Sequence, residues 1–204
     1  MVLESPDSMV YGYIPELRGY EGPWPPPEEL RRRRMSFEEF ARTPWEGKAE
    51  WVDGQAIFMI APTPPPHGRA MGKVSLLLGV AFPALDVLID TGIWVGDGRF
   101  RRPDLLLVYP NYDSTGSLIG IPLVAIEVVS KSSRTQDYID KAAEYAQAGI
   151  GQYWIVDWQV ETITILRNDD GAWRTLAELT REEPVAGVPI ADVGSVVVDL
   201  NEII

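Results

Sequence analysis

Cysteine is absent from the 204-residue chain, and histidine occurs once, as His67. The lack of cysteine excludes disulfide bonds, thiolate metal ligands and thiol nucleophiles. Any bound metal ion must therefore be held by oxygen atoms or by a single imidazole. A chain without disulfides fits a reducing compartment, and we expect a cytoplasmic protein.

Long apolar runs and export signals are also missing. No uninterrupted apolar stretch approaches the roughly 18 residues of a membrane span. The first ten residues, MVLESPDSMV, contain neither a basic segment nor an apolar core of the kind found in signal peptides. We therefore expect neither export nor a membrane partner.

Basic residues are scarce: 18 Lys and Arg stand against 30 Asp and Glu, which gives a net charge of -12. Because affinity for nucleic acid comes mainly from Lys and Arg that neutralise phosphates, this charge counts against a surface that binds nucleic acid throughout. The basic residues are clustered, however, at residues 31–34, at 99–102, and at Lys131 and Arg134. Each cluster fits either a local basic rim around an acidic pocket or a solvated set of ion-pair partners.

Proline separates an arm from a domain. Six of the 17 prolines fall within the first 27 residues, a density that excludes helix and disfavours sheet there. We therefore expect a proline-rich N-terminal arm over residues 1–35 and one domain over residues 36–204. Ser36 and Glu39 have the spacing of a capping box, so a short helix should open the domain at Ser36 and end before Pro44.

The domain alternates strand and helix signals. Strands are predicted at 50–52 and 55–61 around an Asp53-Gly54 turn, and at 86–89, 93–95, 104–109, 123–129, 153–158, 160–166, 172–179 and 195–200. Helices are predicted at 67–82 and 133–149. The expected fold is α/β (α+β mixed), with a central mixed β-sheet flanked by helices. In the second helix we expect an apolar, buried stripe of Tyr138, Ile139, Ala142, Ala143, Tyr145 and Ala146.

Two carboxylates lie within strands that are otherwise apolar. Asp104 opens the segment DLLLV after Pro103, and Glu127 interrupts the segment LVAIEVV. A buried carboxylate is costly unless it is paired or bound to a cation. A hard cation such as Mg²⁺, held by both acids, would explain them, and so would an ion pair between Glu127 and an arginine such as Arg101 or Arg102.

The region from Asp97 to Trp158 contains an ordered set of motifs. DGRFRRPDLLLV is followed by IEVVSKSSRTQDYIDKAAEYAQAGIGQYWIVD, and EWVDG and His67 stand upstream. This set resembles the Uma-type family of restriction endonucleases, a branch of the PD-(D/E)XK nuclease superfamily. The resemblance covers most of residues 36–200 and implies a restriction-endonuclease-like core.

The resemblance also implies the site residues. Asp104, Glu127 and the backbone carbonyl of Val128 would hold Mg²⁺ or Mn²⁺ as the cofactor. The usual Glu-x-Lys pattern of the superfamily would put a lysine at position 129, which is Val129 here. In this branch the lysine comes from the following helix, where Lys141 matches.

Three further residues complete the set of candidates. Glu50 matches an additional N-terminal acid of the family and is expected among the catalytic residues. For His67 two roles are open: it contacts a phosphate, or its ring nitrogens only form hydrogen bonds within the protein. Lys131 is a second candidate for the catalytic lysine, because its even spacing from Glu127 would give both residues the same strand face.

We therefore expect a Mg²⁺- or Mn²⁺-dependent endodeoxyribonuclease, a hydrolase that acts on nucleic acid, DNA above all, as a homodimer. The alternative is a catalytically silent module that keeps the fold and acts by binding or dimerisation, which the acidic charge and Val129 favour. On the enzymatic interpretation, the side chain of Lys141 lies along the helix and carries its ammonium toward the C-terminal end of the strand that bears Glu127, so Lys141→Ala should reduce cleavage and leave the fold and Mn²⁺ affinity nearly intact. The alternative is that Lys141 forms only a weak i, i+4 ion pair with Asp137 on an exposed helix.

Overall fold

The computed structural model describes residues 31–45, 47–59, 64–115, 118–129 and 136–204. They belong to two compact units, which we describe separately. The first unit contains the described residues up to 59 together with residues 97–102, and the second contains those of 64–96 and 103–204. Residues 1–30 of the expected proline-rich arm lie outside the described residues, so both the arm and the single domain over 36–204 stay predictions.

The first unit is a small antiparallel sheet with one short helix. Its elements are β1 (Arg32–Arg34), α2 (Phe37–Arg42), β2 (Lys48–Val52), β3 (Gln55–Met59) and β6 (Arg99–Arg101). The strands follow the order β1-β3-β2-β6. The predicted helix start is confirmed, because Ser36 Oγ accepts a hydrogen bond from the Glu39 N–H at 3.1 Å. The predicted hairpin is confirmed as well: Asp53 and Gly54 have φ values of 49° and 79°, as a two-residue type I′ turn requires.

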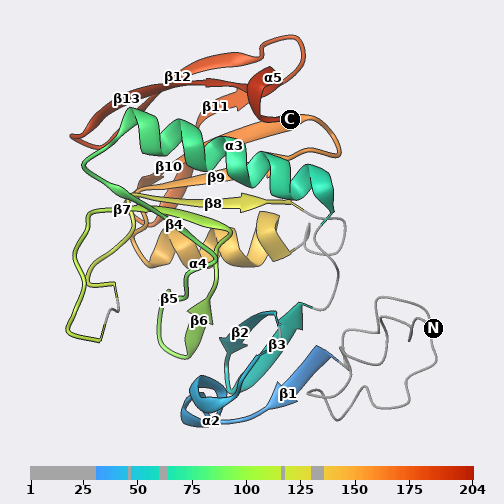
Figure 1. The fold of residues 1–204 in the computed structure, drawn as a ribbon, viewed down its shortest axis with the longest axis vertical. Helices are drawn as coiled ribbons and strands as arrows, with labels where there is room; N and C mark the ends of the chain where they lie inside the picture. Colours follow the sequence, from blue (N-terminus) through green and yellow to red (C-terminus); the bar gives the residue numbers. More distant parts are fainter. Residues whose placement is uncertain (1–30, 46, 60–63, 116–117, 130–135) are drawn as a thin grey trace, which may run out of the picture. The chain divides into compact units, whose positions relative to one another are not determined.

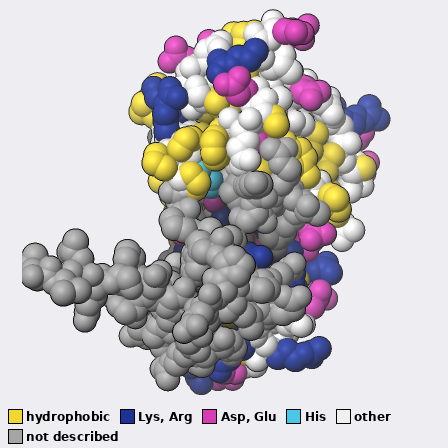
Figure 2. Space-filling model, turned by 90° about the vertical axis from the view of Figure 1, so that its right-hand side faces the viewer, with side chains coloured by type: hydrophobic (Ala, Val, Ile, Leu, Met, Phe, Trp, Pro, Cys, Tyr) yellow, Lys and Arg dark blue, Asp and Glu magenta, His cyan; other side chains and the backbone are white. Residues whose placement is uncertain are grey.

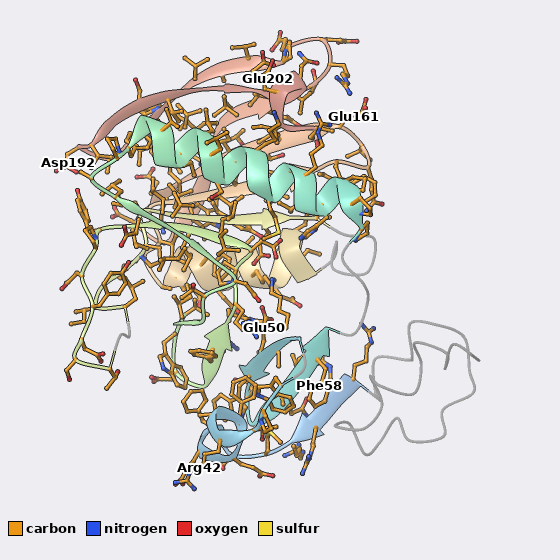
Figure 3. All side chains as sticks on the ribbon, in the orientation of Figure 1. Arg42, Glu50, Phe58, Glu161, Asp192 and Glu202 are labelled. Carbon is orange, nitrogen blue, oxygen red and sulfur yellow. The ribbon has the colours of Figure 1, made fainter. Side chains whose placement is uncertain are left out.

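Aromatic rings fill the core of the first unit (Figure 3). Phe40 and Phe58 are buried, and Trp45 packs on Phe58 with 4.9 Å between ring centroids. Phe37 meets Trp51 edge to face at 5.5 Å. So short a segment has few apolar residues to bury, and large rings supply most of the apolar area.

The second unit is built on a six-stranded sheet with the order β11-β10-β9-β8-β7-β4. Strands β8 and β9 are parallel, and the other neighbouring pairs are antiparallel, which confirms the predicted mixed sheet. The six strands of the sheet are β4 (Asp86–Ile89), β7 (Leu105–Val108), β8 (Val124–Val128), β9 (Gln152–Asp157), β10 (Thr162–Asp169) and β11 (Ala172–Leu179). The unit also contains β5 (Ile93–Trp94) and a separate two-stranded sheet of β12 (Val185–Ile190) and β13 (Gly194–Asp199). The helices are α3 (Pro65–Ala81), the π-helix η3 (Gln136–Lys141), α4 (Ala142–Gln147) and α5 (Leu200–Ile203).

Helices cover both faces of this sheet, with α3 on one side and α4 on the other (Figure 1). Successive residues of a strand point to opposite faces. Leu105 and Leu107 therefore pack in the cluster that contains α3, whereas Leu106 and Val108 pack in the cluster that contains α4. All five residues of β8 are buried, as predicted from the apolar character of this segment.

Sequence patterns missed three strands. β12 pairs with β13 although it contains Gly187 and Pro189, two residue types that weaken a strand prediction. β1 and β6 are rich in arginine and lack the apolar alternation that reveals a strand.

Among the described residues, no helix is long and apolar enough to cross a membrane.

Candidate metal and catalytic site

Strand register brings the two predicted carboxylates to neighbouring positions. In the antiparallel pair of β7 and β8, Leu105 lies opposite Ile126 and Leu106 opposite Ala125. Continuing this register by one residue puts Asp104 opposite Glu127. Residues directly opposite in an antiparallel pair have Cβ atoms about 4.5–5.5 Å apart, so two strands that are distant in sequence deliver two acids to one place.

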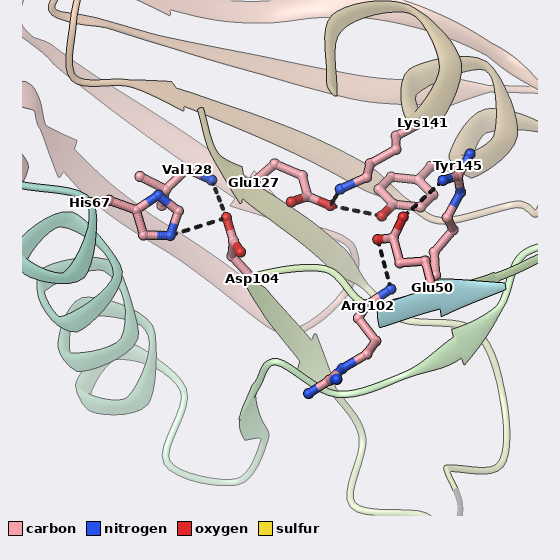
Figure 4. A network of polar contacts seen from close by, with 9 residues as sticks. Glu50, His67, Arg102, Asp104, Glu127, Val128, Lys141 and Tyr145 are labelled. Atoms are coloured by element: carbon pink, nitrogen blue, oxygen red, sulfur yellow. Dashed lines mark hydrogen bonds and ion pairs between the residues drawn. The ribbon is translucent and has the colours of Figure 1, made fainter. Parts of the chain in front are cut away.

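Asp104 is held by a backbone hydrogen bond and lies near His67. Its Oδ2 atom accepts a hydrogen bond from the Val128 N–H at 2.8 Å and lies 3.7 Å from His67 Nε2 (Figure 4). His67 stands in the first turn of α3, which begins at Pro65. The side chain of Asp104 is thereby fixed against the end of β8, next to Glu127.

Glu127 is held by two donors from the following helix. Its Oε1 atom accepts hydrogen bonds from Lys141 Nζ at 2.9 Å and from the Tyr145 hydroxyl at 2.8 Å (Figure 4). Glu127 and Lys141 are each 1% exposed. The structure therefore confirms that Glu127 is buried and gives it Lys141 as an ion-pair partner.

The helix that carries Lys141 differs from the predicted one. Residues Gln136–Lys141 form a π-helix, and the α-helix begins only at Ala142. The predicted buried stripe is wrong at Ile139, which is 63% exposed, and at Ala143, which is exposed. Because i→i+5 bonding turns the later residues relative to an α-helical count, a pattern read at 3.6 residues per turn fails here.

Burial of charge in this helix is the second difference. Lys141 was expected on a stripe that flanks the buried face, with its ammonium reaching toward the strand of Glu127. The ammonium does reach Glu127, but the whole side chain is also buried. An apolar stripe is normally turned inward because buried charge is costly. Here the carboxylate of Glu127 draws the ammonium inward. The effect of removing Lys141 on stability stays a prediction, and its burial in an ion pair favours a loss of stability. Lys131, Ser133 and Arg134 lie outside the described residues.

Glu50 belongs to the first unit and is completely buried. Its Oε2 atom accepts a hydrogen bond from Arg101 Nη1 at 2.8 Å, and its Oε1 atom accepts one from the backbone N–H of Arg102 at 3.1 Å. Both contacts join β2 to the β6 segment. They give Glu50 a structural role within its unit, and its assignment to the catalytic set stays a prediction.

The Glu50–Arg101 ion pair gives a first testable expectation. Arg101→Met should lower the free energy of unfolding by about 3–5 kcal/mol, because it leaves a buried carboxylate without its counter-charge. Urea denaturation of the full chain measures this change. Arg99→Met is the matched control on the same strand: the Arg99–Asp53 pair is partly exposed, and such pairs contribute about 0–1 kcal/mol. Equal losses in the two variants would contradict the argument.

The basic cluster at residues 99–102 is engaged in local contacts. Arg99 pairs with Asp53, Arg101 with Glu50, and Arg102 Nη1 donates to the Gly47 carbonyl. On the face drawn in Figure 2, the described Lys and Arg side chains lie among Asp and Glu and form no continuous basic surface. For this cluster, the interpretation as ion-pair partners fits best.

The carboxylate oxygens of Asp104 and Glu127 are ligands that suit a hard cation. Both are carboxylates, and Mg²⁺ or Mn²⁺ takes oxygen ligands, often one or two carboxylates with water and phosphate completing the shell. Within the described part of the chain, no group of three or more His, Asp and Glu side chains is assembled as a metal site. A site of two carboxylates and one backbone carbonyl is consistent with this observation.

Tyr145 is the residue of this cluster that sequence reasoning left without a role. It was predicted to be buried, and it is, but its hydroxyl was not assigned a partner. The available signal was its i, i+4 spacing from Lys141, which places both side chains on one side of a helix.

Comparison with known proteins identifies the family and the fold of the chain. The family model described as "Putative restriction endonuclease", Uma2, matches residues 37–196. A crystal structure from Anabaena variabilis, described as "a putative nuclease belonging to DUF820", shares the fold with a TM-score of 0.67 and 17% sequence identity, over 83% of this chain and 97% of that one. None of the curated proteins matches the chain. Since the family model covers most of the sequence, including both carboxylates, Lys141 and Tyr145, the chain belongs to the Uma2 family.

Proposed function

We propose that this protein is a cytoplasmic, Mg²⁺- or Mn²⁺-dependent endonuclease that hydrolyses phosphodiester bonds of DNA. The observation that carries the proposal is the buried Glu127–Lys141 pair beside Asp104. Two carboxylates can hold a divalent ion that activates water for hydrolysis, and an adjacent lysine can stabilise negative charge on a phosphate. Membership of a family described by restriction endonuclease activity supports the choice of nucleic acid as the substrate.

The ion would be held by Asp104, Glu127 and the backbone carbonyl of Val128. When bound, a divalent ion supplies Lewis-acid stabilisation of negative charge on a phosphate and makes a water molecule more acidic. Binding would also relieve the repulsion between two neighbouring carboxylates, which is unfavourable when both are ionised.

The chain's own residues would do the rest. Lys141 carries its ammonium to the carboxylate of Glu127 inside a buried environment, where a positive charge acts more strongly than it does in water. From there it can orient the attacking water and stabilise charge that develops on the phosphate. The Val128 N–H keeps Asp104 in place.

The direct test is incubation of the full chain with single-stranded, duplex and branched DNA at low salt, with Mn²⁺ or with a chelator. We expect cleavage of at least one form that requires Mn²⁺ and is lost in Asp104→Asn. Low salt is used because contacts of Lys and Arg with phosphates weaken as salt rises, and the chain has few basic residues to make them. If no form of DNA or RNA is cleaved while the protein still binds nucleic acid or itself, the chain is a silent binding module.

The proposal also includes a homodimer, which the family resemblance suggests. Sedimentation of the full chain measures the mass in solution. A monomer at all concentrations used for cleavage would remove this part of the proposal and leave the reaction untouched.

A further inference from the structure

The Tyr145 hydroxyl shares one oxygen of Glu127 with Lys141. It donates to Oε1 at 2.8 Å, and Lys141 Nζ donates to the same atom at 2.9 Å. Tyr145 is 0% exposed. We propose that Tyr145 is a positioning residue that fixes the orientation of the Glu127 carboxylate for ion binding. This inference rests on the metal-dependent function proposed above.

The position of Tyr145 is fixed from several sides. Its ring meets the buried Tyr153 edge to face, with 5.2 Å between centroids and an interplanar angle of 89°. Two side chains of the sheet hold the backbone of α4 on either side of Tyr145. Trp173 Nε1 donates to the Ala142 carbonyl, and Asn168 Nδ2 donates to the Ala146 carbonyl at 2.8 Å. The hydroxyl is therefore delivered by a rigid element.

Two donors on one oxygen restrict the carboxylate more than either would alone. Lys141 is a flexible side chain with four methylenes, and its ammonium can follow a carboxylate that rotates. The tyrosine hydroxyl is on a rigid ring and cannot follow. Rotation of the Glu127 carboxylate group would break the Tyr145 hydrogen bond first, so Tyr145 defines the orientation in which Glu127 meets an ion.

A carboxylate held in one orientation loses little freedom when it binds an ion. Partners that orient metal ligands in this way typically change metal affinity or activity by roughly 10- to 100-fold when they are removed. We expect a change of this size in Tyr145→Phe, which keeps the ring and its contact with Tyr153 and removes only the hydroxyl.

The experiment is calorimetric titration of wild type, Tyr145→Phe and Tyr138→Phe with Mn²⁺ in the absence of DNA. Tyr138 is the matched control, because its hydroxyl donates to a different carboxylate, Asp157, at 3.3 Å from the same helical region. We expect the Mn²⁺ affinity of Tyr145→Phe to fall by roughly 10- to 100-fold and that of Tyr138→Phe to stay near that of wild type. Circular dichroism verifies that all three are folded.

Cleavage provides a second readout that a merely structural role would not produce. In Tyr145→Phe the concentration of Mn²⁺ needed for half-maximal cleavage should rise, while the rate at saturating Mn²⁺ recovers most of the wild-type value. Lys141→Met should not recover at any Mn²⁺ concentration.

The outcomes separate the two proposals. Wild-type Mn²⁺ affinity in Tyr145→Phe overturns the role of Tyr145 and leaves the nuclease proposal standing. Mn²⁺ binding by wild type that weakens in Tyr145→Phe, without cleavage of any substrate, supports Tyr145 and overturns the nuclease. Absence of Mn²⁺ binding by wild type overturns both.

Discussion

Asp104→Asn is expected to reduce Mn²⁺-dependent cleavage by a factor on the order of 10² or more, the scale of losing one strong electrostatic contact in a transition state. Asparagine keeps the shape of the side chain and an oxygen that can accept from the Val128 N–H. It removes the negative charge that attracts a cation. Calorimetry should show that Mn²⁺ binding is lost together with cleavage, and that the thermal stabilisation by Mn²⁺ disappears.

A matched control for this variant is Asp86→Asn. Asp86 opens β4, the strand next to β7, and lies opposite Val108 at the other end of the shared register. It is not part of the proposed site. Mn²⁺ affinity and cleavage should remain close to wild type in this variant. If Asp104→Asn retains wild-type Mn²⁺ affinity, Asp104 is not a ligand of the ion.

Lys141→Met is expected to have two large effects. Cleavage should fall by a factor on the order of 10² or more, because a positioned charge beside the reacting phosphate is lost. The free energy of unfolding should fall by about 3–5 kcal/mol, because Glu127 is left buried with its main counter-charge removed. Chemical denaturation and initial cleavage rates of the same preparations measure the two effects separately.

A double variant separates stability from catalysis. In Lys141→Met combined with Glu127→Gln, neither residue of the pair is charged, and replacing a buried pair by neutral groups of similar volume is often close to neutral for stability. Stability should therefore recover in large part while cleavage stays lost. Lys131→Ala should cleave much like wild type. A Lys141→Met protein that cleaves normally, with an inactive Lys131→Ala, would assign the catalytic lysine to position 131.

The charge of the chain is compatible with this site. A net charge of -12 slows the encounter of the protein with DNA in general. It does not prevent a DNA phosphate from binding at Asp104 and Glu127 once a divalent ion neutralises these two carboxylates. Cleavage should therefore depend strongly on Mn²⁺, and contacts of Lys and Arg with phosphates should weaken as salt rises. This is why the assay is placed at low ionic strength.

The order and type of most elements followed from local sequence. The Asp53-Gly54 turn, the cap formed by Ser36 and the apolar run of β8 each depend on residues close together in the chain. The stop of the helix at Gly149, where φ is 81°, is equally local. Glu127 was recognisable as a special residue because a carboxylate interrupted an apolar strand. In each case the physical cause acts over a few residues, so a single sequence contains it.

The tertiary structure decided which charges meet. Glu127 pairs with Lys141, 14 residues away, and Glu50 pairs with Arg101, 51 residues away. The sequence allowed Arg101 or Arg102 as a partner of Glu127. It put Lys141 on a flanking stripe from which the ammonium could reach the Glu127 strand, but it did not predict that the whole side chain is buried. Ion pairing depends on distance and on burial, and both are set by which strands lie side by side and by the π-turn before α4. The sequence alone indicated that the carboxylate of Glu127, inside an apolar strand, needs a cation, and the packing of the strands and helices determined which cations Glu127 and Glu50 have.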